Sequence, residues 1–140
     1  IPNIVAVKEA TGNLDQASDI RRRTNDDFLI YSGDDSLTLP ILAVGGTGVV
    51  SVASHLAGRD IQEMVRAYER GDVRRALGLH LHLLPLFKVL FITSNPVPLK
   101  AALNMSGFSV GIPRLPLVEA TPKEKEQIQS VLKELAAAPV

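Results

Sequence analysis

The sequence predicts an α/β protein, with parallel strands and helices alternating over residues 1–71 and a helical region over 72–140. Apolar runs over 4–10, 28–33 and 48–54 are bounded by turn residues, and a continuous apolar run indicates a strand buried on both faces. A segment with helical spacing follows each run. The order strand, loop, helix therefore occurs three times, which is typical of βα units around a parallel sheet.

The three helices of these units are expected where leucine, alanine and isoleucine recur at helical spacing. Asp34 or Asp35 is expected to cap the second helix. The glycines of 45–48 precede a strand, whereas a phosphate-binding loop follows its strand, so they are expected to form a turn. The segments expected to be helical are 14–23, 36–45 and 59–71.

After Gly71 the pattern is helical, without a convincing strand. Pro85 is expected to kink a long first helix. Thr121 and Glu124 have the spacing of a capping box, with proline at the first helical position, which predicts the start of the last helix. The expected helices are 72–92, 98–107 and 122–137, with an extended proline-bearing connector before the last one.

Composition excludes several classes of partner. The 140 residues contain 15 Lys and Arg and 15 Asp and Glu, so no charge imbalance favours nucleic acid or an anionic membrane. There is no cysteine, which excludes disulfides and thiolate metal sites. No apolar stretch reaches the roughly 18 residues of a membrane span, and no signal peptide is recognisable. We expect a cytoplasmic protein.

Three parallel strands do not make a closed structure. They leave two exposed edges on an apolar sheet, and a barrel needs eight strands. The simplest interpretation is that the chain is the C-terminal part of something larger. The alternative is a complete, small three-stranded α/β domain.

Lys8 is the candidate reactive residue. Side chains alternate along a strand, so Ile4, Ala6 and Lys8 are expected on one face and Val7 and Glu9 on the other. A lysine shielded from water more readily supplies the neutral amine, which attacks a carbonyl to form a Schiff base. The alternative is that Lys8 is a surface charge where the strand emerges into solvent.

Five segments follow one another in a recognisable order: NIVAVKEATGN (3–13), FLIYSGDD (28–35), GGTGVVSV (45–52), SNPVPLK (94–100) and PRLPL (113–117). In this order they resemble the C-terminal half of the dihydrodipicolinate synthase family of pyruvate-dependent class I aldolases. The resemblance implies the C-terminal part of a (β/α)8 TIM barrel. The three βα units of 1–71 would be the sixth to eighth, and 72–140 would be a C-terminal helical domain.

The resemblance also implies roles for individual residues. Lys8 would form the Schiff base with pyruvate, the main chain of Val50 would border the bound pyruvate, and Gly33 would line the pocket. The family's proton-donating tyrosine belongs to the absent N-terminal half, and neither Tyr31 nor Tyr68 matches its position. No metal or other cofactor is implied.

The expected function is condensation of pyruvate with aspartate semialdehyde in lysine (diaminopimelate) biosynthesis. The expected partners are these two substrates and the N-terminal half-barrel, in a homotetramer to which the apolar helices after Gly71 contribute contacts. The isolated 140 residues are expected to be inactive. The alternatives are another pyruvate or 2-keto-acid aldolase of the family, or a non-catalytic α/β assembly domain.

Overall fold

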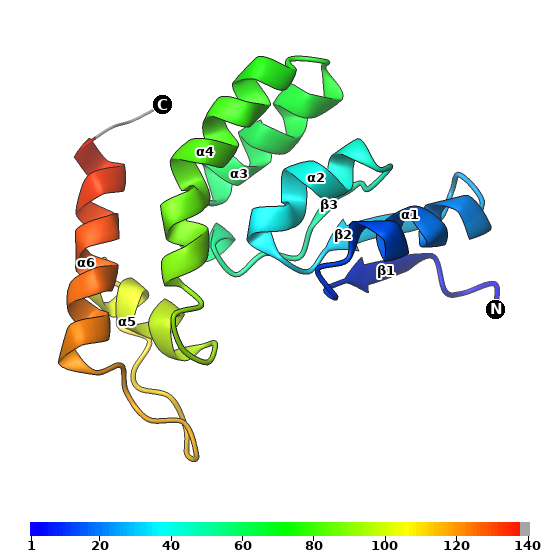
Figure 1. The fold of residues 1–140 in the computed structure, drawn as a ribbon. Coiled ribbons are helices and arrows are strands. Elements are labelled where there is room, and N and C mark those ends of the chain that lie inside the picture. Colours follow the sequence, from blue (N-terminus) through cyan, green and yellow to red (C-terminus); the bar gives the residue numbers. More distant parts are fainter. Residues whose placement is uncertain (138–140) are drawn as a thin grey trace. The chain divides into compact units, whose positions relative to one another are not determined.

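A computed structural model describes residues 1–137. The chain divides into two compact units, the first made of Ile1–Ser51 and Arg59–His80, the second of Val52–Gly58 and the residues from Leu81 onward. Each unit is described by itself below. The α/β class predicted from the sequence is confirmed (Figure 1). The strands β1, β2 and β3 are each followed by an α-helix, and three further α-helices come after them, in the expected order. The predicted division at residues 71 and 72 stays a prediction.

The first unit contains a parallel sheet with the strand order β1-β2-β3. In the register of β1 and β2, Ala6 is the Cα partner of Leu29 and Lys8 that of Tyr31, and Tyr31 in turn pairs with Gly48 of β3. The strands follow one another in space as they do along the chain, at the blue and cyan end of Figure 1. Their bounds are Ala6–Glu9 for β1, Leu29–Ser32 for β2 and Gly48–Val49 for β3.

Helices cover one face of this sheet. The core consists of Ala17 from α1 (Leu14–Arg23), Ile30 from β2 and Ile41 from α2 (Thr38–Ala43), all of them buried. Val7 of β1 packs against this cluster. Lys8 belongs to the opposite face of the sheet, away from this cluster. Partly buried side chains that complete the core are Val7, Ile20, Phe28, Leu37 and Val44.

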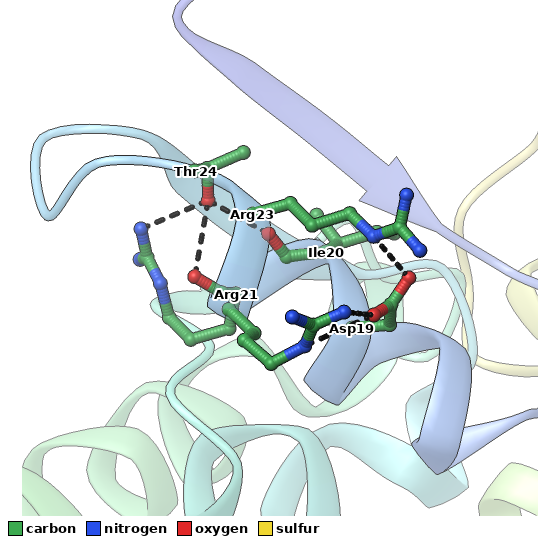
Figure 2. A network of polar contacts seen from close by, with 6 residues as sticks. Asp19, Ile20, Arg21, Arg23 and Thr24 are labelled. Atoms are coloured by element: carbon green, nitrogen blue, oxygen red, sulfur yellow. Dashed lines mark hydrogen bonds and ion pairs between the residues drawn. The ribbon is translucent and has the colours of Figure 1, made fainter.

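The first helix matches its prediction, and its two ends explain why. Asn13 accepts hydrogen bonds through its side chain from the backbone of Asp15 and Gln16, which satisfies otherwise unpaired N–H groups. At the other end, the Arg21 guanidinium donates to the Phe28 carbonyl at 2.9 Å, to Thr24 Oγ1 at 3.0 Å and to the Asn25 carbonyl. Figure 2 shows Arg21 reaching Thr24 in this network. The turn into β2 is thus tied to α1.

The strands are shorter than predicted, and this expectation was wrong in detail. Ile4 and Val5 lie outside β1 and are 55% and 62% exposed, although the Val5 carbonyl still accepts a hydrogen bond from the Leu29 backbone at 3.0 Å. The expected third strand over 48–54 shrinks to Gly48–Val49. A strand is maintained by its neighbours, and β3 pairs with β2 alone among the described residues.

Between β2 and β3 the chain forms a short 3-10 helix, η1 (Asp35–Leu37), which runs into α2. The Asp34 side chain accepts a hydrogen bond from the Ser36 backbone at 2.8 Å. Asp34 is thus a helix cap, as predicted, but it caps η1 rather than α2, whose N-cap Leu37 makes no side-chain cap bond. Gly45 has a φ of +94°, a conformation that suits glycine in a tight turn. The predicted turn before β3 is therefore confirmed.

Two further helices lie partly in the first unit. α3 (Ser54–Glu69) starts earlier than predicted but has non-helical angles at Ala57, so its regular part agrees with the predicted helix from residue 59. α4 (Val73–Val89) follows, and Asp72 accepts a hydrogen bond from the Arg75 backbone at 3.0 Å at its start. Pro85 lies inside α4, as expected.

In the second unit, α5 (Val97–Met105) packs against α6 (Pro122–Ala137). The predicted capping box is confirmed: Thr121 donates from its backbone to Glu124 Oε2 at 2.7 Å, and the Glu124 backbone donates to Thr121 Oγ1 at 3.3 Å. Among the described residues, no helix is long and apolar enough to cross a membrane.

Candidate active site

Lys8 occupies the carboxyl end of β1, on the face of the sheet opposite to the core formed with α1 and α2. Its side chain is exposed, whereas the next residue, Glu9, is 3% exposed on the opposite face. The predicted alternation of Ala6 and Lys8 against Val7 and Glu9 is thus observed within β1, and Ile4 falls outside it. In a parallel α/β sheet the carboxyl ends of the strands are where ligands bind.

Gly33 lies immediately beside the Lys8 side chain. Its backbone N–H donates to the Glu9 carbonyl at 2.6 Å, which extends the β1–β2 ladder by one residue. A Cβ atom placed on Gly33 would lie 2.9 Å from Lys8 Cε and 2.4 Å from Ala10 Cβ, both closer than real Cβ contacts. Glycine at this position therefore makes room for the lysine side chain. The structure brings these two predicted residues together.

Val50 follows β3 and continues the same edge. Its backbone N–H donates to the Ser32 carbonyl at 2.8 Å, and its side chain is 50% exposed. By alternation from Gly48, Val50 belongs to the same face as Lys8 and Gly33. The three residues thus occupy one face at the carboxyl ends of three consecutive strands. Gly33 follows the middle strand, so it lies between Lys8 and Val50 along the sheet.

The register adds a residue that the sequence reasoning did not include in the site. Tyr31 is the Cα partner of Lys8, so it shares the face of Lys8, one strand away. Its ring lies against Gly48, where an added Cβ would be 3.4 Å from Tyr31 Cε1. The alternation in the segment FLIYSG, which places Tyr31 on the face of Gly33, was the signal available. Tyr31 therefore lies next to Lys8 on the neighbouring strand of the candidate site.

Other groups at this edge serve the backbone. Ser32 donates through its hydroxyl to the Asp34 carbonyl at 2.6 Å, and Asp34 caps η1. Among residues 1–137, no cluster of three or more His, Cys, Asp or Glu side chains could hold a metal ion.

A cavity of about 320 Å³ lies in the second unit, away from these residues in the chain. Its polar lining is engaged within the unit: Lys100 donates to the Ile112 carbonyl at 2.8 Å, and Lys125 pairs with Glu119 at 3.0 Å. None of Lys8, Gly33 and Val50 lines it. The candidate site around Lys8 therefore lies on the face of the sheet opposite to the core of the first unit, and not in this cavity.

Comparison with known proteins agrees with this arrangement. The sequence is 61% identical over 135 residues to 4-hydroxy-tetrahydrodipicolinate synthase of Cyanothece sp., and 62% identical over 134 residues to that of Desulforudis audaxviator. Each match covers 96% of this chain and 46% of the relative. The chain therefore spans about half the length of these curated relatives.

Solved structures give the same result. The structure resembles dihydrodipicolinate synthase from Cyanidioschyzon merolae, with a TM-score of 0.94 and 47% identity, over 98% of this chain and 46% of that one. It also resembles the enzyme from Aquifex aeolicus, with a TM-score of 0.93 and 47% identity, over 96% and 46% of the two chains. The Dihydrodipicolinate synthetase family matches residues 1–135. This chain belongs to that family.

Proposed function

We propose that this chain is the C-terminal part of a (β/α)8-barrel synthase that joins pyruvate to aspartate semialdehyde through a Schiff base on Lys8. Residues 1–71 supply the last three βα units and residues 72–140 a helical domain. The observation that carries the proposal is the position of Lys8, at a strand end and against the bare Cα of Gly33. The names of the similar enzymes support the choice of substrates.

The reaction begins when the neutral amine of Lys8 attacks the ketone of pyruvate and water leaves, which forms an imine. The protonated imine withdraws electrons, so the pyruvate methyl group loses a proton and becomes an enamine. The enamine carbon then forms a bond to the aldehyde carbon of aspartate semialdehyde, while the C=O π bond of the aldehyde breaks, its oxygen takes up a proton to become a hydroxyl, and the imine to Lys8 is restored. Attack of the substrate's own amine on the imine carbon closes the ring and releases Lys8. No metal or dissociable cofactor enters this sequence.

The other residues on this face have supporting roles. Gly33 leaves space for the stem of Lys8, and the main chain of Val50 borders the bound pyruvate. The groups that transfer protons and hold the pyruvate carboxylate come from the N-terminal half-barrel, which also covers the open face of the sheet. Without that cover the Lys8 side chain stays in contact with water.

We extend the proposal to the whole protein, which would act in lysine (diaminopimelate) biosynthesis in the cytoplasm as a homotetramer. A similar solved structure, 38% identical with a TM-score of 0.93, is a monomeric dihydrodipicolinate synthase variant. The fold therefore does not by itself fix the assembly. Sedimentation of the whole protein as a monomer at all concentrations would contradict the tetramer and leave the chemistry untouched.

The test uses a completed enzyme, in which an N-terminal half from the Cyanothece relative is joined to residue 1 of this chain. Product formation from pyruvate and aspartate semialdehyde is expected, and Lys8→Arg is expected to abolish it. Preference for a different aldehyde would indicate another aldolase of the family. A folded completed enzyme that is inactive with every aldehyde would favour a non-catalytic assembly domain.

A further inference from the structure

We propose that the buried Glu9 carboxylate is a positioning residue, which acts through Thr11 to hold the strand end that carries Lys8. The inference rests on the proposed function, because it assigns a purpose to a residue next to the reactive lysine. It concerns a residue that does not itself touch substrate.

Glu9 is a charged residue in a buried position. It is 3% exposed, although its neighbour Lys8 is exposed and the loop that follows is exposed as well. Withdrawing a carboxylate from water is costly unless hydrogen bonds compensate it. Glu9 Oε1 accepts a hydrogen bond from the Thr11 backbone at 2.9 Å and a second from Thr11 Oγ1 at 2.5 Å. Both donors belong to the turn that leaves β1.

The contacts continue from this turn into α1. Thr11 Oγ1 accepts a hydrogen bond from the Asn13 backbone at 3.2 Å. Asn13 Oδ1 in turn accepts from the backbone of Asp15 at 2.9 Å and of Gln16 at 3.1 Å, at the start of the helix. A continuous set of hydrogen bonds therefore runs from the Glu9 carboxylate to the first turn of α1.

The main chain of Glu9 makes the second connection. Its carbonyl accepts from the Gly33 backbone at 2.6 Å, and Gly33 is the residue against which the Lys8 stem lies. Glu9 thus joins the turn through its side chain and the neighbouring strand through its backbone. Lys8 and Glu9 are joined by one peptide group. A change in the backbone torsion angles of Glu9 would therefore tilt this group and turn the Lys8 side chain relative to Gly33.

This placement matters for the rate of imine formation. A displacement of about 1 Å in a reacting group can cost roughly 100-fold in rate. A purely structural role for Glu9 predicts a different outcome, namely a lower yield of folded protein with an unchanged rate for each folded molecule. The rate for each folded molecule therefore distinguishes a positioning role of Glu9 from a purely structural one.

The experiment measures, in the completed enzyme, the rate at which pyruvate and borohydride trap an adduct on Lys8, per folded molecule and at saturating pyruvate. Glu9→Leu removes the acceptor, and Glu9→Gln keeps an oxygen that Thr11 can reach. Thr11→Val removes the hydroxyl donor, and Thr11→Ser restores it. Thr11 is exposed, so its variants are expected to fold.

We expect Glu9→Leu and Thr11→Val to trap roughly 10- to 100-fold more slowly, and Glu9→Gln and Thr11→Ser to trap close to the wild-type rate. If Glu9→Leu does not fold, the Thr11 pair decides. Wild-type rates in folded Thr11→Val and Glu9→Leu would overturn the inference and leave the proposed function intact. Failure of the unsubstituted enzyme to form any adduct on Lys8 would instead remove the proposed function, and the inference with it.

Discussion

The Lys8 side chain lies so close to residue 33 that this residue has no room for a side chain, and it can do so because residue 33 is glycine. A Cβ on Gly33 would lie 2.9 Å from Lys8 Cε. It would also lie 2.4 Å from Ala10 Cβ, an atom fixed to the backbone of the β1–α1 turn. The lysine and the glycine are therefore a pair, set on adjacent strands by the register of the parallel sheet.

The first prediction follows from this pair. Gly33→Ala in the completed enzyme should displace both the turn and the Lys8 stem, and slow adduct formation by roughly 10- to 100-fold, as expected for a displacement near 1 Å. The measurement is the rate of borohydride trapping with pyruvate. Gly78→Ala is the control, because nothing lies within 4 Å of its added Cβ. Gly78 is inside α4, where alanine should stabilise by up to about 1 kcal/mol.

The second prediction separates the arginines at the end of α1. Arg21 is partly buried and donates to the Phe28 and Asn25 carbonyls and to Thr24 Oγ1, so Arg21→Ala removes these hydrogen bonds and should destabilise the fold by about 1–2 kcal/mol. Arg22 pairs with Asp19 at the surface, where an ion pair contributes little. Thermal unfolding should therefore show a clear drop for Arg21→Ala and hardly any for Arg22→Ala. Equal effects would contradict the anchoring role of the Arg21 hydrogen bonds to the turn.

The third prediction concerns pH. Hydrogen bonds from Arg22 and then Arg23 lower the pKa of the Asp19 carboxyl below its ordinary value of 3.8. A carboxyl with a lowered folded-state pKa contributes stability above its unfolded pKa and loses it as the pH falls through the folded-state pKa. Asp19→Asn should thus be slightly less stable than the parent at neutral pH and indistinguishable from it well below pH 3.8. Asp19 is exposed, so added salt should shrink the difference.

Much of the fold could be predicted because its signals are local. The apolar spacing over 14–23 and the Thr121–Glu124 capping box are local features of the sequence, so α1 and α6 have the expected bounds. The third strand could not be predicted in length, since its extent depends on a neighbouring strand rather than on its apolar residues. A strand is only as long as its pairing.

The candidate site divides in the same way. The type and position of Lys8 indicated its chemistry, and alternation placed it with Ala6. The proximity of Tyr31 to Lys8 depends on the register between strands. The burial of Glu9 depends on its contacts with the following turn, and a glutamate after a lysine gives no local sign of it.

The fourth prediction is that these 140 residues alone are inactive. Lys8 is exposed and Val50 is 50% exposed, so we expect the amine to stay in contact with water in the isolated chain. A positioned acid or base, supplied by the other half, typically contributes roughly 10²–10⁴-fold. The assay is condensation of pyruvate with aspartate semialdehyde, repeated after a separately made N-terminal half is added. Full activity of the chain alone would contradict this division of roles.

The most direct test of the account is to locate the covalent adduct. The completed enzyme is treated with pyruvate and borohydride, digested, and the modified peptide identified by mass spectrometry. The account predicts one adduct, on Lys8, that requires pyruvate and is lost in Lys8→Arg. An adduct on Lys88 or Lys100 with none on Lys8 would contradict it.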